Sequence, residues 1–255
     1  MVWLLALSAT SVFAGSEWFA RTWQSDDGLP DNSVTSIAQT SDGYLWVATQ
    51  GGLVRFDGVQ FKRLSLPVIS GMPTGMIREL TVCGGNHLWM ALEGGVVVSA
   101  ASDETKIYTS ANGLPVFRPL SIAEDADGAV WVGYSDGSAC RILGEAVRRF
   151  SGRDGLPGVG ICTVATDAKK QVWFAKVGQV GKFQNGRFVS LATMPDRAVC
   201  IGARQGGGIW ICSGREFFKY EEGQKPVKIA ELAPAGEIVE PLDLFEERIG
   251  AIWIG

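Results

Sequence analysis

Eight polar or aromatic residues occupy positions suited to binding a ligand. Each one lies either after a Gly-Leu-Pro turn motif or shortly before a turn glycine. The eight candidates are Asp31, Asn32, Gln50, Glu93, Phe117, Arg118, Ser135 and Asp136. Planar polar side chains beside an aromatic ring suit a sugar, and arginine can hold the carboxylate of a uronate through two parallel hydrogen bonds. As a set these residues therefore predict binding chemistry, while for any single one of them a role as a solvated loop residue is the favoured interpretation.

The residue types that catalysis needs are scarce in this chain. The one histidine, His87, lies in the turn segment GGNHLW, so neither a Ser-His-Asp triad nor a phosphoacceptor histidine is expected. Asp42 and Asp127 fall at the same place in two Asp-Gly turns, and a turn role accounts for them. The DADG segment at 125–128 lacks the alternating oxygen ligands of a calcium loop. We expect no catalytic residue, no metal site and no cofactor.

The composition is that of a folded β-rich protein. Of 255 residues, 46% are hydrophobic and 20% are charged, which is enough apolar material for a large core. The 33 glycines and 9 tryptophans suit many short strands joined by tight turns. The net charge of −4 gives no electrostatic reason to expect nucleic acid as a partner.

The five cysteines show no metal-binding spacing, because none of them forms a CxxC pair. Cys162 and Cys200 fall near the start of the same expected strand in neighbouring repeats. A disulfide between them is one interpretation for an exported protein. Buried thiols are the favoured interpretation, because cysteine is among the most buried residue types.

A repeat of about 42 residues organises the chain. Its first mark is a tryptophan at spacings of 37 to 43 residues: Trp46, Trp89, Trp131, Trp173, Trp210 and Trp253. Its second mark is a Gly-Leu-Pro or Gly-Met-Pro turn that begins 18 residues before each of the first four tryptophans. Two independent marks on one period indicate a structural repeat.

Each copy predicts four short strands. In the first copy the segments VTSIAQT, YLWVATQ, LVRFDG and VQFKRLS alternate and are separated by SDG and GG turns. Such a tandem unit is typical of a β-propeller blade, in which stacked sheets cover each other's faces and the tryptophan lies between sheets. We predict an all-β propeller with five full blades and an incomplete sixth.

The repeat resembles the two-component regulator propeller repeat, whose pattern is a GLP turn, a DG turn, a Trp-apolar-small segment and a Gly-Leu pair. Residues 28–58, GLPDNSVTSIAQTSDGYLWVATQGGLVRFDG, match it nearly throughout, residues 113–142 match well, and the last two copies match weakly. The resemblance spans nearly all of the chain after residue 14.

This resemblance implies a periplasmic sensor region that binds a small molecule or oligosaccharide and belongs to a two-component signal transduction protein. Further blades, a membrane span and a signalling domain such as a histidine kinase would be its partners within one polypeptide, and a homodimer is compatible with it. The alternatives are a lyase-like propeller enzyme acting on polysaccharide and a secreted protein-binding scaffold. Clustered carboxylates in the central funnel would favour the enzyme, and a large exposed apolar patch would favour the scaffold.

The two ends of the chain carry further expectations. Residues 1–14 resemble a signal peptide with a small-x-small site ending at Ala14, although no basic residue precedes the apolar run. A buried strand or a start inside a longer gene are the alternatives. Residues 15–255 would form the propeller, with 15–30 as an outer closing strand. Because that strand has no partner blade, we expect a fragment of a seven-bladed ring, tethered to the inner membrane by sequence beyond Gly255.

Overall fold

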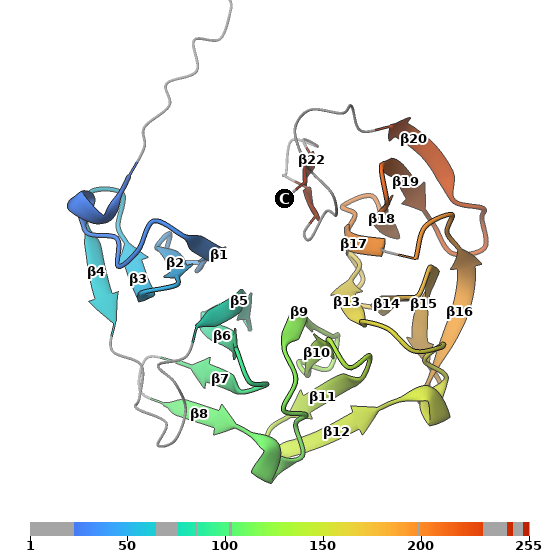
Figure 1. Cartoon of the computed structure of the whole chain (residues 1–255), viewed down its shortest axis with the longest axis horizontal. Coiled ribbons are helices and arrows are strands. Elements are labelled where there is room, and N and C mark those ends of the chain that lie inside the picture. The colour runs from blue at the N-terminus through green and yellow to red at the C-terminus, as the bar shows by residue number, and fades with distance from the viewer. Residues whose placement is uncertain are drawn as a thin grey trace, which may run out of the picture.

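The computed structural model describes residues 23–64, 76–84, 86–101, 104–197, 199–231, 244–246 and 252–254. These residues form five four-stranded antiparallel sheets and a two-stranded sheet, each with its strands in chain order. The sheets radiate from a common centre, with the first strand of each innermost and the fourth outermost (Figure 1). The predicted β-propeller of five full blades and an incomplete sixth is confirmed. The described blades form an open arc.

We number the four-stranded sheets blades 1 to 5 in chain order, and the two-stranded sheet follows blade 5. The strands are β1 (Val34–Gln39), β2 (Leu45–Thr49), β3 (Gly52–Phe56) and β4 (Phe61–Leu64) in blade 1; β5 (Ile77–Cys83), β6 (His87–Leu92), β7 (Val97–Ala100) and β8 (Thr105–Tyr108) in blade 2; β9 (Pro119–Glu124), β10 (Val130–Tyr134), β11 (Ala139–Leu143) and β12 (Ala146–Phe150) in blade 3; β13 (Thr163–Thr166), β14 (Val172–Lys176), β15 (Gln179–Gln184) and β16 (Arg187–Thr193) in blade 4; β17 (Val199–Ala203), β18 (Ile209–Ser213), β19 (Glu216–Tyr220) and β20 (Val227–Glu231) in blade 5; and β21 (Leu244–Glu246) and β22 (Ile252–Ile254).

The Gly-Leu-Pro motif ends a short 3-10 helix and starts the approach to the next inner strand. The three helices are η1 (Ser25–Asp27), η2 (Ser110–Asn112) and η3 (Gly152–Asp154). Each is followed by the motif glycine in the left-handed region, with φ of 107°, 99° and 97°, which glycine adopts without steric cost. The motif leucine that comes next is buried in all three copies. The glycine thus sets the chain direction and the leucine anchors it.

The turn between the first and second strands, which we call the 1–2 turn, is tied to the periodic tryptophan. In blade 3, Asp125 accepts the amides of Asp127 and Ala129 through Oδ1, and the indole N–H of Trp131 donates to its Oδ2 at 2.8 Å. Asp167 does the same for Trp173 in blade 4, at 3.0 Å. Burial raises the pKa of Asp125, but hydrogen bonds from Trp131 and Arg141 outweigh it and leave that pKa below its usual value.

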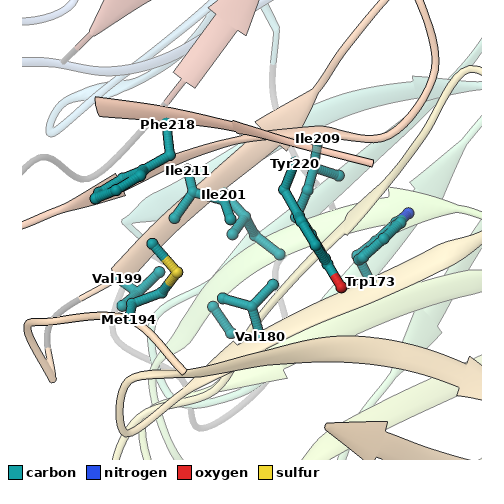
Figure 2. Close-up of a cluster of buried hydrophobic side chains, with 10 residues drawn as sticks. Trp173, Val180, Met194, Val199, Ile201, Ile209, Ile211, Phe218 and Tyr220 are labelled. Atoms are coloured by element: carbon teal, nitrogen blue, oxygen red, sulfur yellow. The ribbon is translucent and has the colours of Figure 1, made fainter. Parts of the chain in front are cut away.

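Each blade buries its apolar face against the next blade along the chain. Trp131 of blade 3 has no exposed surface and packs with Val164, Phe174 and Phe188 of blade 4. Trp173 of blade 4 packs in the same way on blade 5, where its ring meets Tyr220 edge-on at 5.5 Å. Figure 2 shows this second interface. The periodic tryptophans of blades 3 and 4 therefore lie between sheets, as the repeat pattern predicted.

All five cysteines are buried thiols, the interpretation that the sequence favoured. Cys162 lies in the interface between blades 3 and 4, whereas Cys200 lies in the apolar cluster between blade 5 and β21. The two thiols thus lie in different apolar clusters and are not bonded to each other.

The expected signal peptide at residues 1–14 and residues 15–22 of the expected closing strand lie outside the described residues. Residues 23–30 are described and contain η1 rather than a strand, so a strand over the whole of 15–30 is wrong. The reason is visible in blade 2, where β8 ends at Tyr108 and the η2 turn follows. Trp23 corresponds to Tyr108 in that comparison, since each lies five residues before the motif glycine. No helix of the described residues is long and apolar enough to cross a membrane.

Trp131 provides the sharpest test of the blade interface. We expect Trp131→Ala to lower the free energy of unfolding by about 3–5 kcal/mol, because it removes a fully buried ring that contacts both blades. Trp131→Phe keeps much of the ring volume and should cost clearly less. Urea unfolding of the two variants measures both values. Equal stability of Trp131→Ala and the unmodified protein would show that this interface does not hold the blades together.

Candidate functional site

Two sets of turns share one face of the arc, which we call the loop face. The first set consists of the lead-in loops that precede the inner strands, at residues 29–33, 114–118 and 156–162. The second consists of the 2–3 turns between second and third strands, at residues 50–51, 93–96 and 135–138. A backbone hydrogen bond joins the two in each of the first three blades: Gln50 N to Ser33 O at 3.0 Å, Glu93 N to Met76 O at 2.9 Å, and Ser135 N to Arg118 O at 2.9 Å.

Neighbouring blades interlock on the loop face through glycines in the 2–3 turns. A Cβ atom on Gly95 would lie 1.9 Å from the carbonyl oxygen of Pro115, and one on Gly137 would lie 2.2 Å from that of Gly160. Both oxygens belong to the lead-in loop of the following blade. Because no side chain fits between turn and loop, the loops of adjacent blades are in direct backbone contact.

Buried side chains of the following blade reinforce this interlock. The hydroxyl of Tyr134 donates to Gly95 O at 3.3 Å, and the ammonium of Lys176 donates to Gly137 O at 2.6 Å. Lys176 is only 5% exposed, and this burial lowers the pKa of its amine. Each side chain comes from the end of a second strand and reaches back to the preceding blade. The loop face is therefore rigidly seated on the blade framework.

Blade 1 places its three predicted site residues on the loop face, but two of them also maintain the loop. Asp31 Oδ1 accepts the amide of Ser33 at 2.7 Å, and Asn32 Oδ1 accepts the amide of Ser25 at 2.8 Å. Gln50 is exposed. The side chains of Asp31 and Asn32 thus have a structural role whether or not they contact a ligand.

Glu93 and Asp136 are likewise engaged within their own blades. Glu93 forms an ion pair with Arg78 at 2.5 Å. Asp136 accepts hydrogen bonds from the amide and hydroxyl of Ser138 and pairs with Arg149. Both carboxylates therefore already have partners that a ligand would have to displace.

Phe117 and Arg118 in blade 3 are the predicted site residues most open to a ligand. The Phe117 ring is 48% exposed, and Arg118 is exposed with no side-chain partner among the residues that the structure describes. The backbone bond from Ser135 to Arg118 brings these two residues beside the 2–3 turn that carries Ser135 and Asp136. The structure thus gathers four of the eight candidates in blade 3.

Three apolar residues of the loop face were missed by the sequence reasoning. Val116 is 68% exposed, Val159 is 92% exposed and Ile161 is 47% exposed. They lie in the lead-in loops of blades 3 and 4, where the residues after Gly-Leu-Pro are Val-Phe and Gly-Val-Gly-Ile rather than the Asp-Asn of blade 1. This difference between the loop sequences could have indicated the apolar surface. Together with Phe117 they give these two loops an apolar surface.

An axial cavity of about 310 Å³ lies among the inner strands β5, β9, β13 and β17. Its charged lining residues are Glu79, Glu124 and Lys170. Glu124 pairs with Lys170 at 2.9 Å and accepts the amide of Gly84, while Glu79 accepts the hydroxyl of Ser36. The polar groups of the cavity thus largely serve to link neighbouring inner strands.

A second depression, of about 590 Å³, lies between blades 3 and 4 and is bordered by their 1–2 turns. Several arginine and lysine side chains line this depression, but most of them form ion pairs with nearby carboxylates. Arg141 pairs with both Asp125 and Asp127, and Lys182 pairs with Glu222. Of the residues that the structure describes, no three His, Cys, Asp or Glu side chains are grouped to hold a metal ion. His87 lies exposed at the start of β6, at the end of the blade next to its 1–2 turn.

Residues 28–51 match the family model described as Two component regulator propeller. The chain carries this propeller repeat. The match covers the Gly-Leu-Pro turn, the inner strand, the 1–2 turn and the tryptophan strand of blade 1, and agrees with the resemblance found across the repeats. None of the curated proteins matches the sequence.

Solved structures share the propeller fold at low sequence identity. The extracellular domain of BT3049 from B. thetaiotaomicron, described as a hybrid two component system, has 20% identity and a TM-score of 0.70, covering 88% of this chain and 32% of that one. Virginiamycin B lyase from Staphylococcus aureus has 15% identity and a TM-score of 0.72, covering 87% and 77%. The WD40 β-propeller domain of Doa1 has 12% identity and a TM-score of 0.66, covering 87% and 75%.

The interlock of the loop face can be measured with two glycine substitutions. Gly137 and Gly128 have φ of 82° and 78°, so alanine is strained at both, by roughly 1–2 kcal/mol. Only Gly137 faces a neighbouring loop, whereas no atom lies within 4 Å of a Cβ on Gly128. We expect Gly137→Ala to cost about 1–3 kcal/mol more than Gly128→Ala, measured by urea unfolding. Equal costs would contradict the backbone contact between blades 3 and 4.

Proposed function

We propose that this chain is the ligand-binding propeller of an extracytoplasmic sensor in a two-component signalling system. It binds its ligand on the loop face and does not convert it chemically. The observation that carries the proposal is the repeated backbone bond between lead-in loop and 2–3 turn. The bond is the same in blades 1 to 3, while the side chains that it holds differ from blade to blade.

The family repeat at residues 28–51 and the fold shared with an extracellular domain of a hybrid two component system support the signalling role. On this proposal the ligand-bound propeller passes its signal to a membrane-tethered output domain of the same polypeptide. A lyase-like activity is less well supported, because the charged groups of the axial cavity are engaged with neighbouring inner strands.

The ligand class follows from the loop face of blades 3 and 4. Phe117 offers an exposed ring on which the apolar face of a sugar can stack, and Arg118 offers a guanidinium, without a partner among the described residues, that suits a carboxylate. Val159 and Ile161 extend the apolar surface into the next loop. An acidic oligosaccharide, with both apolar ring faces and carboxylates, fits this combination best.

Calorimetric titration of the purified protein with neutral and uronic-acid oligosaccharides tests this function. We expect Arg118→Gln to weaken binding of the uronic-acid probes by roughly tenfold or more, because a hydrogen bond to a charged group contributes about 1.5–3 kcal/mol. It should leave the binding of neutral probes nearly unchanged. Phe117→Ala should weaken both kinds of probe.

Matched controls come from exposed side chains away from the loop face. Arg148→Gln and Leu143→Ala remove an exposed arginine and an exposed apolar side chain from the outer part of blade 3, and we expect them to bind like the unmodified protein. Failure of every oligosaccharide to bind would overturn the saccharide assignment. Unweakened binding by the Phe117→Ala, Arg118→Gln double variant would move the site away from blade 3.

A further inference from the structure

Two cysteines of blade 5 lie directly opposite each other. In the antiparallel ladder of β17 and β18, the register pairs Cys200 with Cys212. Both belong to one apolar cluster with Phe217 and Leu244, so their side chains point to the same side of the sheet. The sequence suggested a different pairing because it aligned cysteines by repeat position, whereas this pair is formed across a hairpin within one blade.

The ladder geometry brings the Cα atoms of the two residues within the span of a disulfide. Directly opposed residues of antiparallel strands have Cα atoms about 4.5–5.5 Å apart, and disulfides span about 4.4–6.8 Å. At the closed end of this hairpin, Arg204 N donates to Gly208 O at 3.3 Å. Counting back along the register from this bond makes Cys200 and Cys212 a hydrogen-bonded pair, the wider of the two types. Their Cβ atoms then lie at or beyond the upper limit that a disulfide prefers, which makes such a bond strained and readily reduced.

Cys200 is the more accessible cysteine of the pair. Its strand β17 borders the axial cavity of about 310 Å³, and Cys200 is 6% exposed. Cys212 lies on the next strand and has no exposed surface. A small disulfide can therefore meet the Cys200 sulfur first, and Cys212 is placed to resolve the product.

We propose that Cys200 and Cys212 form a reversible disulfide, a redox modification site whose oxidant is a small-molecule disulfide. In the first step the Cys200 thiolate attacks one sulfur of the reagent, forms a mixed disulfide and releases one thiol. The Cys212 thiolate then attacks the Cys200 sulfur and releases the second thiol. Two electrons pass from the protein to the reagent, and the two protons lost by the cysteines end on the released thiols.

Burial makes the second step, the attack by Cys212, slow at neutral pH and faster in alkaline solution. Desolvation raises the pKa of the Cys212 thiol to about 11, so the thiolate fraction increases as the pH rises toward that value. Among the residues that the structure describes, Phe217, Leu244, Trp210 and Ile252 complete the apolar cluster around the pair. The cross-link would join two strands beneath Leu244, where β21 packs on blade 5.

Oxidation of the purified, fully reduced protein with glutathione disulfide tests the proposal. After alkylation of remaining thiols and proteolysis, we expect a single linked peptide pair that joins Cys200 to Cys212, lighter than the separate peptides by two hydrogen atoms. Excess dithiothreitol should restore both thiols. Cys212→Ala should instead retain a glutathione adduct on Cys200, and Cys162→Ala should give the same linked pair as the unmodified protein.

Three results would overturn the proposal. They are a protein that stays fully reduced at high glutathione disulfide and pH 9, a glutathione adduct on Cys200 that Cys212 does not resolve, and a link that forms only after urea unfolding. Circular dichroism of each sample confirms that the folded protein reacts. The inference does not depend on the proposed sensor role, because the measurement requires no ligand and no particular cellular compartment.

Discussion

The structure depends on one constraint, which is that a single twisted four-stranded sheet cannot bury both of its faces. Each blade solves this by placing its periodic tryptophan against the following blade, as Trp131 does on blade 4 and Trp173 on blade 5. The indole brings a polar N–H into an apolar interface, where an unpaired donor is costly. Asp125 and Asp167 accept it, and the same carboxylates close the 1–2 turns. Blade packing and turn geometry therefore rest on one side-chain pair in each of these blades.

This arrangement explains why the loop face is free to vary in sequence while staying fixed in position. The contacts that recur from blade to blade in holding its loops are made by the backbone, through the bonds at Gln50, Glu93 and Ser135 and the close approaches at Gly95 and Gly137. A backbone contact constrains few side chains other than the glycines. The lead-in loops can thus carry Asp-Asn in one blade and Val-Phe in another without loss of the fold.

The blade architecture could be predicted from the sequence because its marks are local and recur. The glycine of each Gly-Leu-Pro turn needs a positive φ, and the tryptophan recurs at the spacing of one blade. The site was less predictable, since Asp31 and Asp136 look like ligand contacts but bond to nearby backbone amides. The Cys200–Cys212 pair was missed for a related reason. Repeat position indicates where residues lie within a blade, whereas contacts between residues depend on register within a hairpin.

The backbone contact between the loops of adjacent blades also affects how ligand binding could change the rest of the protein. The 2–3 turn of blade 3 touches the lead-in loop of blade 4 at Gly137 and Gly160, and Lys176 ties that turn to blade 4. A ligand that contacts both Arg118 and Ile161 would therefore bridge two blades whose loops are in close backbone contact. On the proposed function, such a ligand would act on the angle between blades, because packed interfaces shift between discrete arrangements rather than deform gradually. Loops that are held firmly against the blades are thus compatible with the proposed signalling role, since a contact made at a loop can change the relative orientation of whole sheets.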